Sequence, residues 1–296
     1  MKKTKLFAAA VILVLIPGFA FAGGASTACQ TRYPVVMAHG MAASAKILGI
    51  VDYWWGIPEA LRDEGAKVYV TSVNAMDSTL DKAADFKQQL LHILAVTGAS
   101  KANIIGHSHG GIYTRLAMTN MGIGSKVASL TTISTPHRGS SIADLVVEGL
   151  PDWLLSAGTD IVDFVYAFIF GDTNPDSMQN ALDLTTDYMV NVFNPNTPNV
   201  PGVYYQSWCA AARYSCPSVV LEPTWIVLLA MEGTNDGMVS VPSAKWGTYR
   251  GTQQGAWYSP GVDHCNIVGH LFGITPGFDA PDFYVDVVKD LKNRGY

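Results

Sequence analysis

The chain has 296 residues and four cysteines, with 49% hydrophobic and 15% charged residues and a formal net charge of −5. This length and apolar content are enough for a large core within one α/β domain. The acidic balance argues against a nucleic-acid partner, because phosphate contacts require clustered lysines and arginines.

The first 22 residues have the pattern of a signal peptide. Basic residues precede the apolar run LFAAAVILVLI, and Ala20-Phe21-Ala22 places small residues at the −3 and −1 positions of a cleavage site before Gly23. The run is short for a bilayer span, so we expect no integral membrane anchor and a protein that is secreted, or periplasmic in transit. Loss of the leader removes three lysines and leaves 16 basic against 24 acidic residues, a net charge of about −8.

Short apolar runs alternate with helical patterns along residues 23–296. Strands are expected in YPVVMA (33–38), KVYVTSV (67–73), ANIIG (102–106), VASLTTIS (127–134) and WIVLLAM (225–231), and helices in 81–98 and 111–122. This alternation predicts an α/β fold with a mainly parallel central sheet and helices on both faces. Ligands of such sheets bind at the carboxyl ends of the strands, the edge expected to carry His39, Ser108 and Thr135.

Residues 139 to about 200 interrupt this alternation. They contain bulky apolar stretches such as VVEGLPDWLLSAG and IVDFVYAFIFG. Two interpretations remain open for them, a buried helical hairpin and a cap over the carboxyl edge of the sheet. Neither interpretation requires a second domain.

The sequence GHSHG places Ser108 between an expected strand and an expected helix. It fits the pattern G-x-S-x-G, in which a sharp, strained turn presents a serine at the strand end and glycines allow close backbone approach. Ser108 is therefore the candidate nucleophile. It requires a histidine base, because a serine hydroxyl is a poor nucleophile by itself.

Among the seven histidines, His264 is the candidate base. His107 and His109 adjoin Ser108, but adjacent residues on a tight turn point away from one another. Chains with this elbow order the triad as serine, acid and histidine, which leaves His264 and His270. His264 follows the strand-like AWYS in a loop, whereas we expect His270 to pack within a helix.

Asp236 is the candidate acid that would orient His264. It follows the apolar run 225–231 on an Asn-Asp-Gly turn. A buried carboxylate there would fix the imidazole tautomer and stabilise the imidazolium. Glu232 is an alternative four residues upstream, while Asp263 adjoins the histidine and is poorly placed to accept from its Nδ1.

Two backbone amides are expected to hold the oxyanion of an acyl-transfer reaction. One is the N–H of His109, the residue after the nucleophile. The other is the N–H of Met41 in AHGMAAS, where Gly40 gives the freedom to turn that amide inward. A metal site at His107, His109 and His137 is disfavoured, because no acid or cysteine accompanies them at metal-ligand spacing.

In their order along the chain, these motifs resemble the true lipases of the Pseudomonas, Burkholderia and Proteus type, which have the α/β-hydrolase fold. The matching segments run from Tyr33 to about Gly273 and are YPVVMAHGM, GHSHGG, STPHRGS, GTNDGMV and DHCNIVGHLFG. The resemblance implies a triacylglycerol lipase that acts at a lipid–water interface through an acyl-enzyme, with a mobile lid near 145–170. Some lipases of this type need a dedicated folding chaperone, so the resemblance allows such a chaperone as a partner of this chain.

Two departures from those lipases concern metal and disulfides. They hold a structural calcium ion through two aspartates, but one position is Asn266 here and the stretch 209–232 contains no aspartate. We therefore expect no tightly bound calcium and no other cofactor, because losing both charges weakens a hard-cation site. Their cysteine positions also differ, and the short loop between Cys209 and Cys216 makes that pair the disulfide expected for this chain.

Two other functions are compatible with these motifs. A short-chain esterase or polyester hydrolase of the same fold would use the same triad. An inactive lipid-binding homologue is the second, although such a protein has no need to keep a complete catalytic set.

Overall fold

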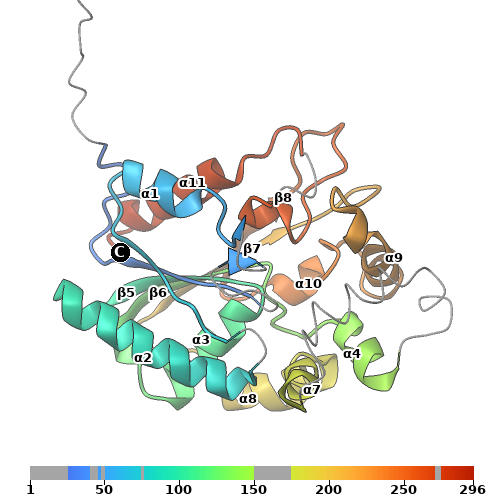
Figure 1. The fold of residues 1–296 in the computed structure, drawn as a ribbon, viewed down its shortest axis with the longest axis horizontal. Helices are drawn as coiled ribbons and strands as arrows, with labels where there is room; N and C mark the ends of the chain where they lie inside the picture. The colour runs from blue at the N-terminus through green and yellow to red at the C-terminus, as the bar shows by residue number, and fades with distance from the viewer. Residues whose placement is uncertain (1–25, 41–45, 48–50, 75–76, 150–174, 271–274) are drawn as a thin grey trace, which may run out of the picture.

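The computed structural model describes residues 26–40, 46–47, 51–74, 77–149, 175–270 and 275–296. Six parallel strands form the central sheet in the order β4-β1-β5-β6-β7-β8 (Figure 1). They are β1 (Val35–Ala38), β4 (Val68–Val70), β5 (Ala102–His107), β6 (Val127–Ile133), β7 (Tyr204–Ala210) and β8 (Thr248–Gln253). A separate antiparallel pair joins β2 (Lys46–Ile47) to β3 (Val51–Asp52). The expected parallel sheet is confirmed.

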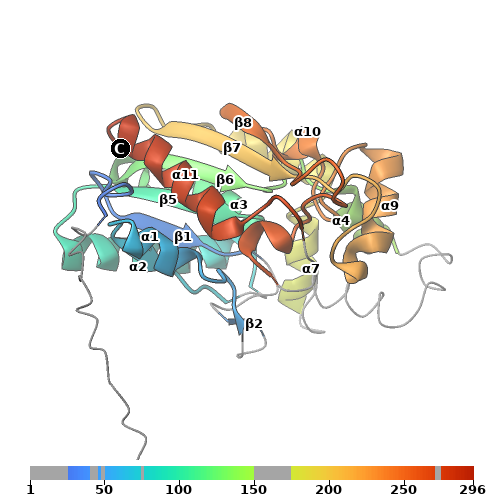
Figure 2. The ribbon, with the colours of Figure 1, turned by 90° about the horizontal axis from the view of Figure 1, so that it is seen from above.

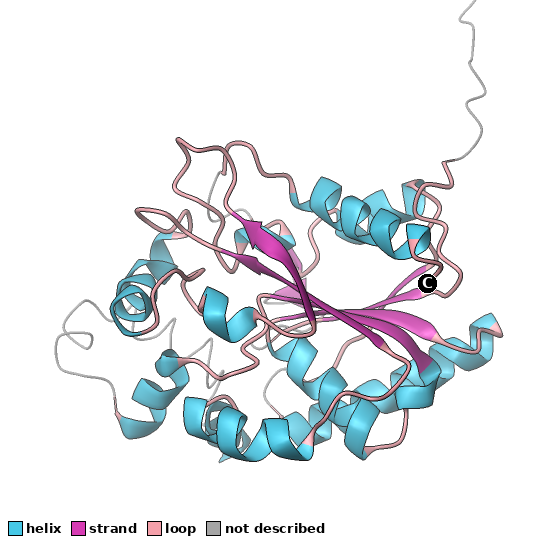
Figure 3. Cartoon of the chain, turned by 180° about the vertical axis from the view of Figure 1, so that it is seen from behind, coloured by secondary structure: helices cyan, strands magenta, loops and turns pink. Residues whose placement is uncertain are grey.

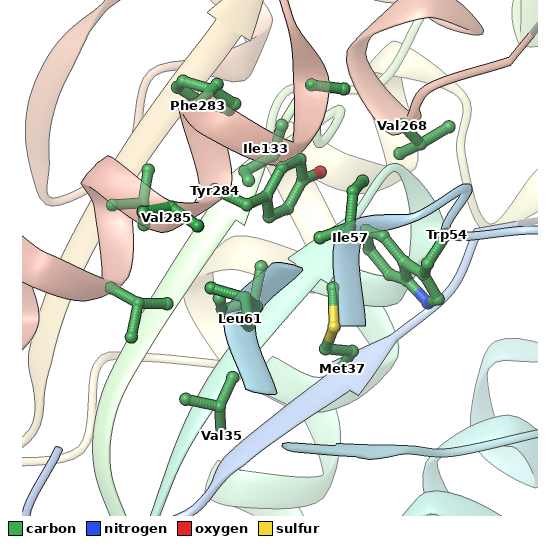
Figure 4. Packing of buried hydrophobic residues seen from close by; sticks show 14 of the residues in the cluster. Val35, Met37, Trp54, Ile57, Leu61, Ile133, Val268, Phe283, Tyr284 and Val285 are labelled. Carbon is green, nitrogen blue, oxygen red and sulfur yellow. The ribbon is translucent and has the colours of Figure 1, made fainter. Parts of the chain in front are cut away.

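Helices cover both faces of this sheet, because alternate strand residues point to opposite sides. The covering helices are α1 (Ile57–Asp63), α2 (Thr79–Thr97), α3 (His109–Asn120) and α11 (Ala280–Asn293). Val35 and Met37 pack in a core with α1 and α11, shown around Tyr284 in Figure 4. Val36 and Ala38 pack in the opposite core with α2 and α3. Figure 3 shows the sheet between these two helical layers, and in Figure 2 α11 lies in front of the strands.

Local sequence signals fix the ends of α2. The Ser78 side chain accepts from the Asp81 backbone N–H at the start, and Gly98 ends the helix with a left-handed φ of 66°. Phe86 and Leu90 are buried on its inner face, and so is Lys82. Lysines are rarely buried on the core side of a helix.

A third group of helices lies beyond one end of the sheet. The remaining elements are α4 (Ser141–Glu148), α7 (Pro175–Leu182), α8 (Asn194–Asn196), α9 (Glu222–Met231), α10 (Val241–Ala244) and the short turns η1 (Gly124–Lys126), η2 (Tyr188–Phe193), η3 (Val219–Leu221) and η4 (Asn266–Val268). Figures 1 and 2 agree in placing α4, α7 and α9 together at this end. Their apolar residues share one core. Within the described residues, no helix is long and apolar enough to cross a bilayer.

The cap expected at 139–200 is described in part. Its two flanks contain α4 and α7, which pack against each other. The segment 150–174, which includes most of the lid expected near 145–170, lies outside the described residues. The leader expected at 1–22 lies outside them as well.

The prediction of a strand at 225–231 is wrong, because these residues belong to helix α9. An uninterrupted apolar run has no periodicity that separates a strand from a helix. Pro223 stands in the first turn of α9, and Leu228 and Met231 are favourable helix formers. The stretch AWYS forms a turn, and the sheet is completed by β7 and β8.

The expected Cys209–Cys216 disulfide is not formed, since all four cysteines are free thiols. Cys209 lies in β7, where its thiol donates to the carbonyl of Ala210 at 3.0 Å. Cys216 instead packs against the turn at Gly237, where an added Cβ would lie 3.2 Å from its sulfur. The closeness of the two cysteines in sequence therefore does not bring their sulfurs together.

Candidate active site

Ser108 lies on a strained turn between β5 and α3. Its backbone angles are φ 54° and ψ −131°, a conformation that residues with a Cβ rarely adopt. The helix after it packs tightly on β1, because a Cβ on Gly110 would lie 2.2 Å from the carbonyl oxygen of Ala38. The expected elbow is thus present, with a buried serine at the end of a central strand.

His264 and Asp236 complete a hydrogen-bonded path to this serine. His264 Nε2 lies 2.9 Å from Ser108 Oγ, and its Nδ1 lies 2.8 Å from Asp236 Oδ2. A carboxylate only accepts, so Nδ1 carries the proton and the Nε2 lone pair faces the serine hydroxyl. The imidazole and the carboxylate are both buried. The other Asp236 oxygen accepts the backbone N–H groups of Met238 and Val239, at 3.0 and 2.7 Å, which fixes the carboxylate.

The two other carboxylates considered for the acid, Glu232 and Asp263, have different partners. Glu232 accepts the backbone N–H of Ser141 at 2.7 Å and the hydroxyl of Ser240. Asp263 accepts three backbone N–H groups, those of residues 218, 265 and 266. The structure therefore places Asp236 at His264 Nδ1 and uses Glu232 and Asp263 to hold loops.

The two histidines that flank Ser108 turn their rings to other partners. His107 Nδ1 bonds the hydroxyl of Tyr53, and His109 Nε2 lies 2.8 Å from Thr79 Oγ1. Burial lowers the pKa of both imidazoles well below the ordinary value, so both are neutral. His109 begins α3, where its backbone N–H is one of the amides free of intrahelical partners. Met41, the other expected oxyanion donor, lies outside the described residues.

Lys82 is a buried lysine next to this site that the sequence analysis missed. Its Nζ lies 3.3 Å from His109 Nδ1, and its side chain is 1% exposed. When Lys82 is protonated it can only donate, so His109 Nδ1 then accepts and its Nε2–H donates to Thr79. The sequence signal was available, since Lys82 stands four residues before Phe86 on the apolar face of α2.

The buried lysine makes stability depend on pH. Burial lowers the pKa of Lys82 to about 7 from 10.5, with Asp77 and Asp183 partly opposing this shift. Between these pH values the unfolded chain binds more protons than the folded one, so stability rises with pH. Lys82→Met should therefore increase the free energy of unfolding more at pH 6 than at pH 10, measured by urea denaturation. An equal change at both pH values would contradict this, and exposed Lys126→Met is the control.

The residues at the calcium position do not fit a calcium site. The Asn266 carbonyl oxygen accepts the hydroxyl of Thr275 at 2.9 Å, and its amide donates to the backbone of His270. The neighbouring Asp263 already accepts three backbone N–H groups. In the part of the chain that the structure describes, no three His, Cys, Asp or Glu side chains gather to hold a metal ion.

Comparison of the chain with known proteins identifies its family. A family model of the α/β hydrolase fold matches residues 33–165. The chain is 40% identical to a triacylglycerol lipase of Pseudarthrobacter phenanthrenivorans, over 91% of this chain and 98% of that protein. It is 40% identical to a triacylglycerol lipase of Burkholderia plantarii over 91% and 87%, and 34% identical to one of Vibrio cholerae over 90% and 89%.

Solved structures agree at the level of the fold. The mature lipase of Bacillus licheniformis superposes with a TM-score of 0.65 at 22% identity, covering 88% of this chain and 91% of that one. A metagenomic carboxyl esterase gives 0.67 at 16% identity, covering 92% and 78%. With the relatives at 34–40% identity over most of its length, the chain belongs to the triacylglycerol lipase family of α/β-hydrolase fold.

Proposed function

We propose that the chain is an exported triacylglycerol lipase with Ser108, His264 and Asp236 as its catalytic triad. The observation that carries this proposal is the path of hydrogen bonds from Ser108 Oγ through the His264 ring to Asp236. Its family membership supports ester hydrolysis. The leader pattern in residues 1–22 supports export.

In the acylation step, Ser108 Oγ attacks the ester carbonyl carbon while its proton passes to His264 Nε2. Asp236 stabilises the imidazolium through the Nδ1–H hydrogen bond. The N–H groups of His109 and Met41 stabilise the oxyanion of the tetrahedral intermediate. This intermediate collapses with cleavage of the ester C–O bond, and the alcohol leaves with the proton from Nε2.

The deacylation step repeats this sequence with water. His264 Nε2 takes a proton from a water molecule as its oxygen attacks the acyl carbon of the acyl-enzyme. The second tetrahedral intermediate is held by the same two amides. Its collapse breaks the bond to Ser108 Oγ, which regains the proton, and the carboxylic acid is released.

The segment 139–200 acts as a cap over the site within the single domain 23–296. Glu232 supports this role, because it lies four residues before Asp236 and accepts the backbone N–H of Ser141 at the first residue of α4. The base of the cap is thereby tied to the loop that holds the acid. An ester would enter beneath this cap to reach Ser108.

A substrate series tests the lipase assignment. Hydrolysis of tributyrin should rise steeply once its concentration exceeds the solubility limit and emulsion droplets form. Saturable turnover of soluble short esters without such a rise would favour the short-chain esterase or polyester hydrolase instead. Absence of turnover on every ester would favour the inactive lipid-binding homologue.

The same reaction should proceed without calcium, because Asn266 has partners within the protein and the described residues around it gather no set of acidic ligands. Dialysis against EDTA is expected to leave the melting temperature and the rate on soluble p-nitrophenyl butyrate unchanged. The control is the same protein dialysed against buffer with calcium. A loss of rate that added calcium restores would contradict the proposal.

A further inference from the structure

The hydroxyl of Tyr53 joins the oxyanion turn to the nucleophile elbow. The backbone N–H of Gly40 donates to this oxygen at 3.0 Å, and the hydroxyl bonds His107 Nδ1. The Tyr53 oxygen accepts from Gly40, and the tautomer of His107 decides whether the hydroxyl or Nδ1 is the donor in the bond between them. An added Cβ on Gly40 would lie 2.8 Å from both this hydroxyl and Ser108 Cβ, so the three groups are in close contact.

His107 in turn packs against the ring of His264. The two ring centroids are 4.6 Å apart with an interplanar angle of 42°, and both side chains are 1% exposed. The ring of His264 is therefore held by Asp236 at Nδ1 and by Ser108 at Nε2, and the tilted ring of His107 packs against it. A ring so enclosed has little freedom to rotate away from the serine.

His107 is neutral, as a residue packed against the base His264 should be. Burial and the nearby His264 lower its pKa well below the ordinary value, so it stays neutral across the working pH range. A neutral ring allows His264 to become an imidazolium in each turnover without repulsion from a second cation. The hydrogen bond between Tyr53 and His107 also fixes the ring that packs against His264.

We propose that Tyr53 and His107 are positioning residues that couple the oxyanion turn at Gly40 to the orientation of His264. One hydroxyl holds the Gly40 amide and the His107 ring together, and the ring holds the base. This inference rests on the proposed triad, since it concerns how the base is aimed. Displacement at Tyr53 would therefore disturb oxyanion stabilisation and proton transfer together.

Tyr53→Phe is the first test, because it removes the hydroxyl and keeps the ring against Trp54, whose centroid lies 5.1 Å away. We expect kcat for soluble p-nitrophenyl butyrate to fall about 10- to 100-fold, with KM within about threefold, since misplacement by about 1 Å costs about 100-fold. The melting temperature should stay close to that of the parent. A kcat within twofold of the parent, or a loss matched by unfolding, would overturn the proposal.

His107→Asn separates the two contacts of the histidine. Asparagine keeps an amide that can bond the Tyr53 hydroxyl but lacks a ring to pack against His264. The double variant Tyr53→Phe/His107→Asn should be no slower than the slower single variant, because both residues act through one connected path. Fully additive losses in a folded double variant would overturn the coupling.

Tyr284→Phe is the matched control. Tyr284 is buried in the same aromatic group, 5.7 Å from Trp54, and its hydroxyl has no hydrogen-bond partner among the described residues. Its loss should leave kcat unchanged, and a decrease equal to that of Tyr53→Phe would overturn the specific role of Tyr53. Parent protein that a fluorophosphonate fails to label at Ser108 would instead contradict the triad. Labelled parent with normal Tyr53→Phe kinetics contradicts only the coupling.

Discussion

Ser108→Ala should lower the turnover of p-nitrophenyl butyrate by about 10⁵-fold or more, because removal of a serine nucleophile alone costs this order of magnitude. The substitution deletes the Oγ atom that lies 2.9 Å from His264 Nε2 and leaves the elbow backbone in place. The measurement is the initial rate of hydrolysis by the purified variant. Circular dichroism and a melting curve show whether the variant is folded. The variant should remain folded, since alanine is smaller than the serine it replaces and the site is buried.

Ser134→Ala controls for backbone strain in this experiment. Ser108 and Ser134 are the two non-glycine residues with positive φ in the described part of the chain. Ser134 Oγ accepts the backbone N–H of Ala210 at 3.1 Å, so its loss should reduce stability by about 1–3 kcal/mol and preserve turnover. A folded Ser108→Ala protein with the parent rate would show that the nucleophile is another residue.

Asp236→Asn should lower kcat by about 10⁴-fold, as loss of the orienting carboxylate does in a serine triad. An asparagine amide that donates to His264 would favour the wrong tautomer, with the proton on Nε2 facing Ser108. An asparagine oxygen can still accept the backbone N–H groups of Met238 and Val239, so the turn should keep its shape. Kinetics on a soluble ester and a melting curve give the two readouts.

Glu232→Gln is the matched control for the acid. Glutamine keeps an oxygen that can accept the backbone N–H of Ser141, so activity should stay within a few fold of the parent. A small decrease in melting temperature is expected, because the bond to Ser240 loses its charge. A loss equal to that expected for Asp236→Asn, with the Asp236 variant active, would move the acid role to Glu232.

The parts of the site that could be predicted from the sequence are those with a local signature. The elbow is specified by small residues around Ser108, and the order of the triad along the chain selected His264 from seven histidines. Asp236 stood out because an Asn-Asp-Gly turn follows an apolar run. The parallel sheet followed from strands that alternate with amphipathic helices, and the strand register confirms it.

Other features depend on packing that a single sequence does not display. Residues 225–231 are all apolar and show no periodicity, so only the tertiary structure distinguishes helix α9 from a strand. Tyr53 lies 54 residues before His107, and no spacing rule joins their side chains before the strand order is known. Lys82 differs from these features, because its place on the apolar face of α2 can be recognised from the sequence alone.

Labelling with a fluorophosphonate tests the central claim most directly, because it marks an activated serine by covalent bond formation at Oγ. Intact-protein mass spectrometry, followed by peptide mapping, should show one phosphonyl group on Ser108, with ester hydrolysis lost in proportion to the label. Asp236→Asn should react far more slowly, and Ser108→Ala should not be labelled at this peptide. Full inactivation with the label on another residue, or unchanged hydrolysis after complete labelling of Ser108, would contradict the account.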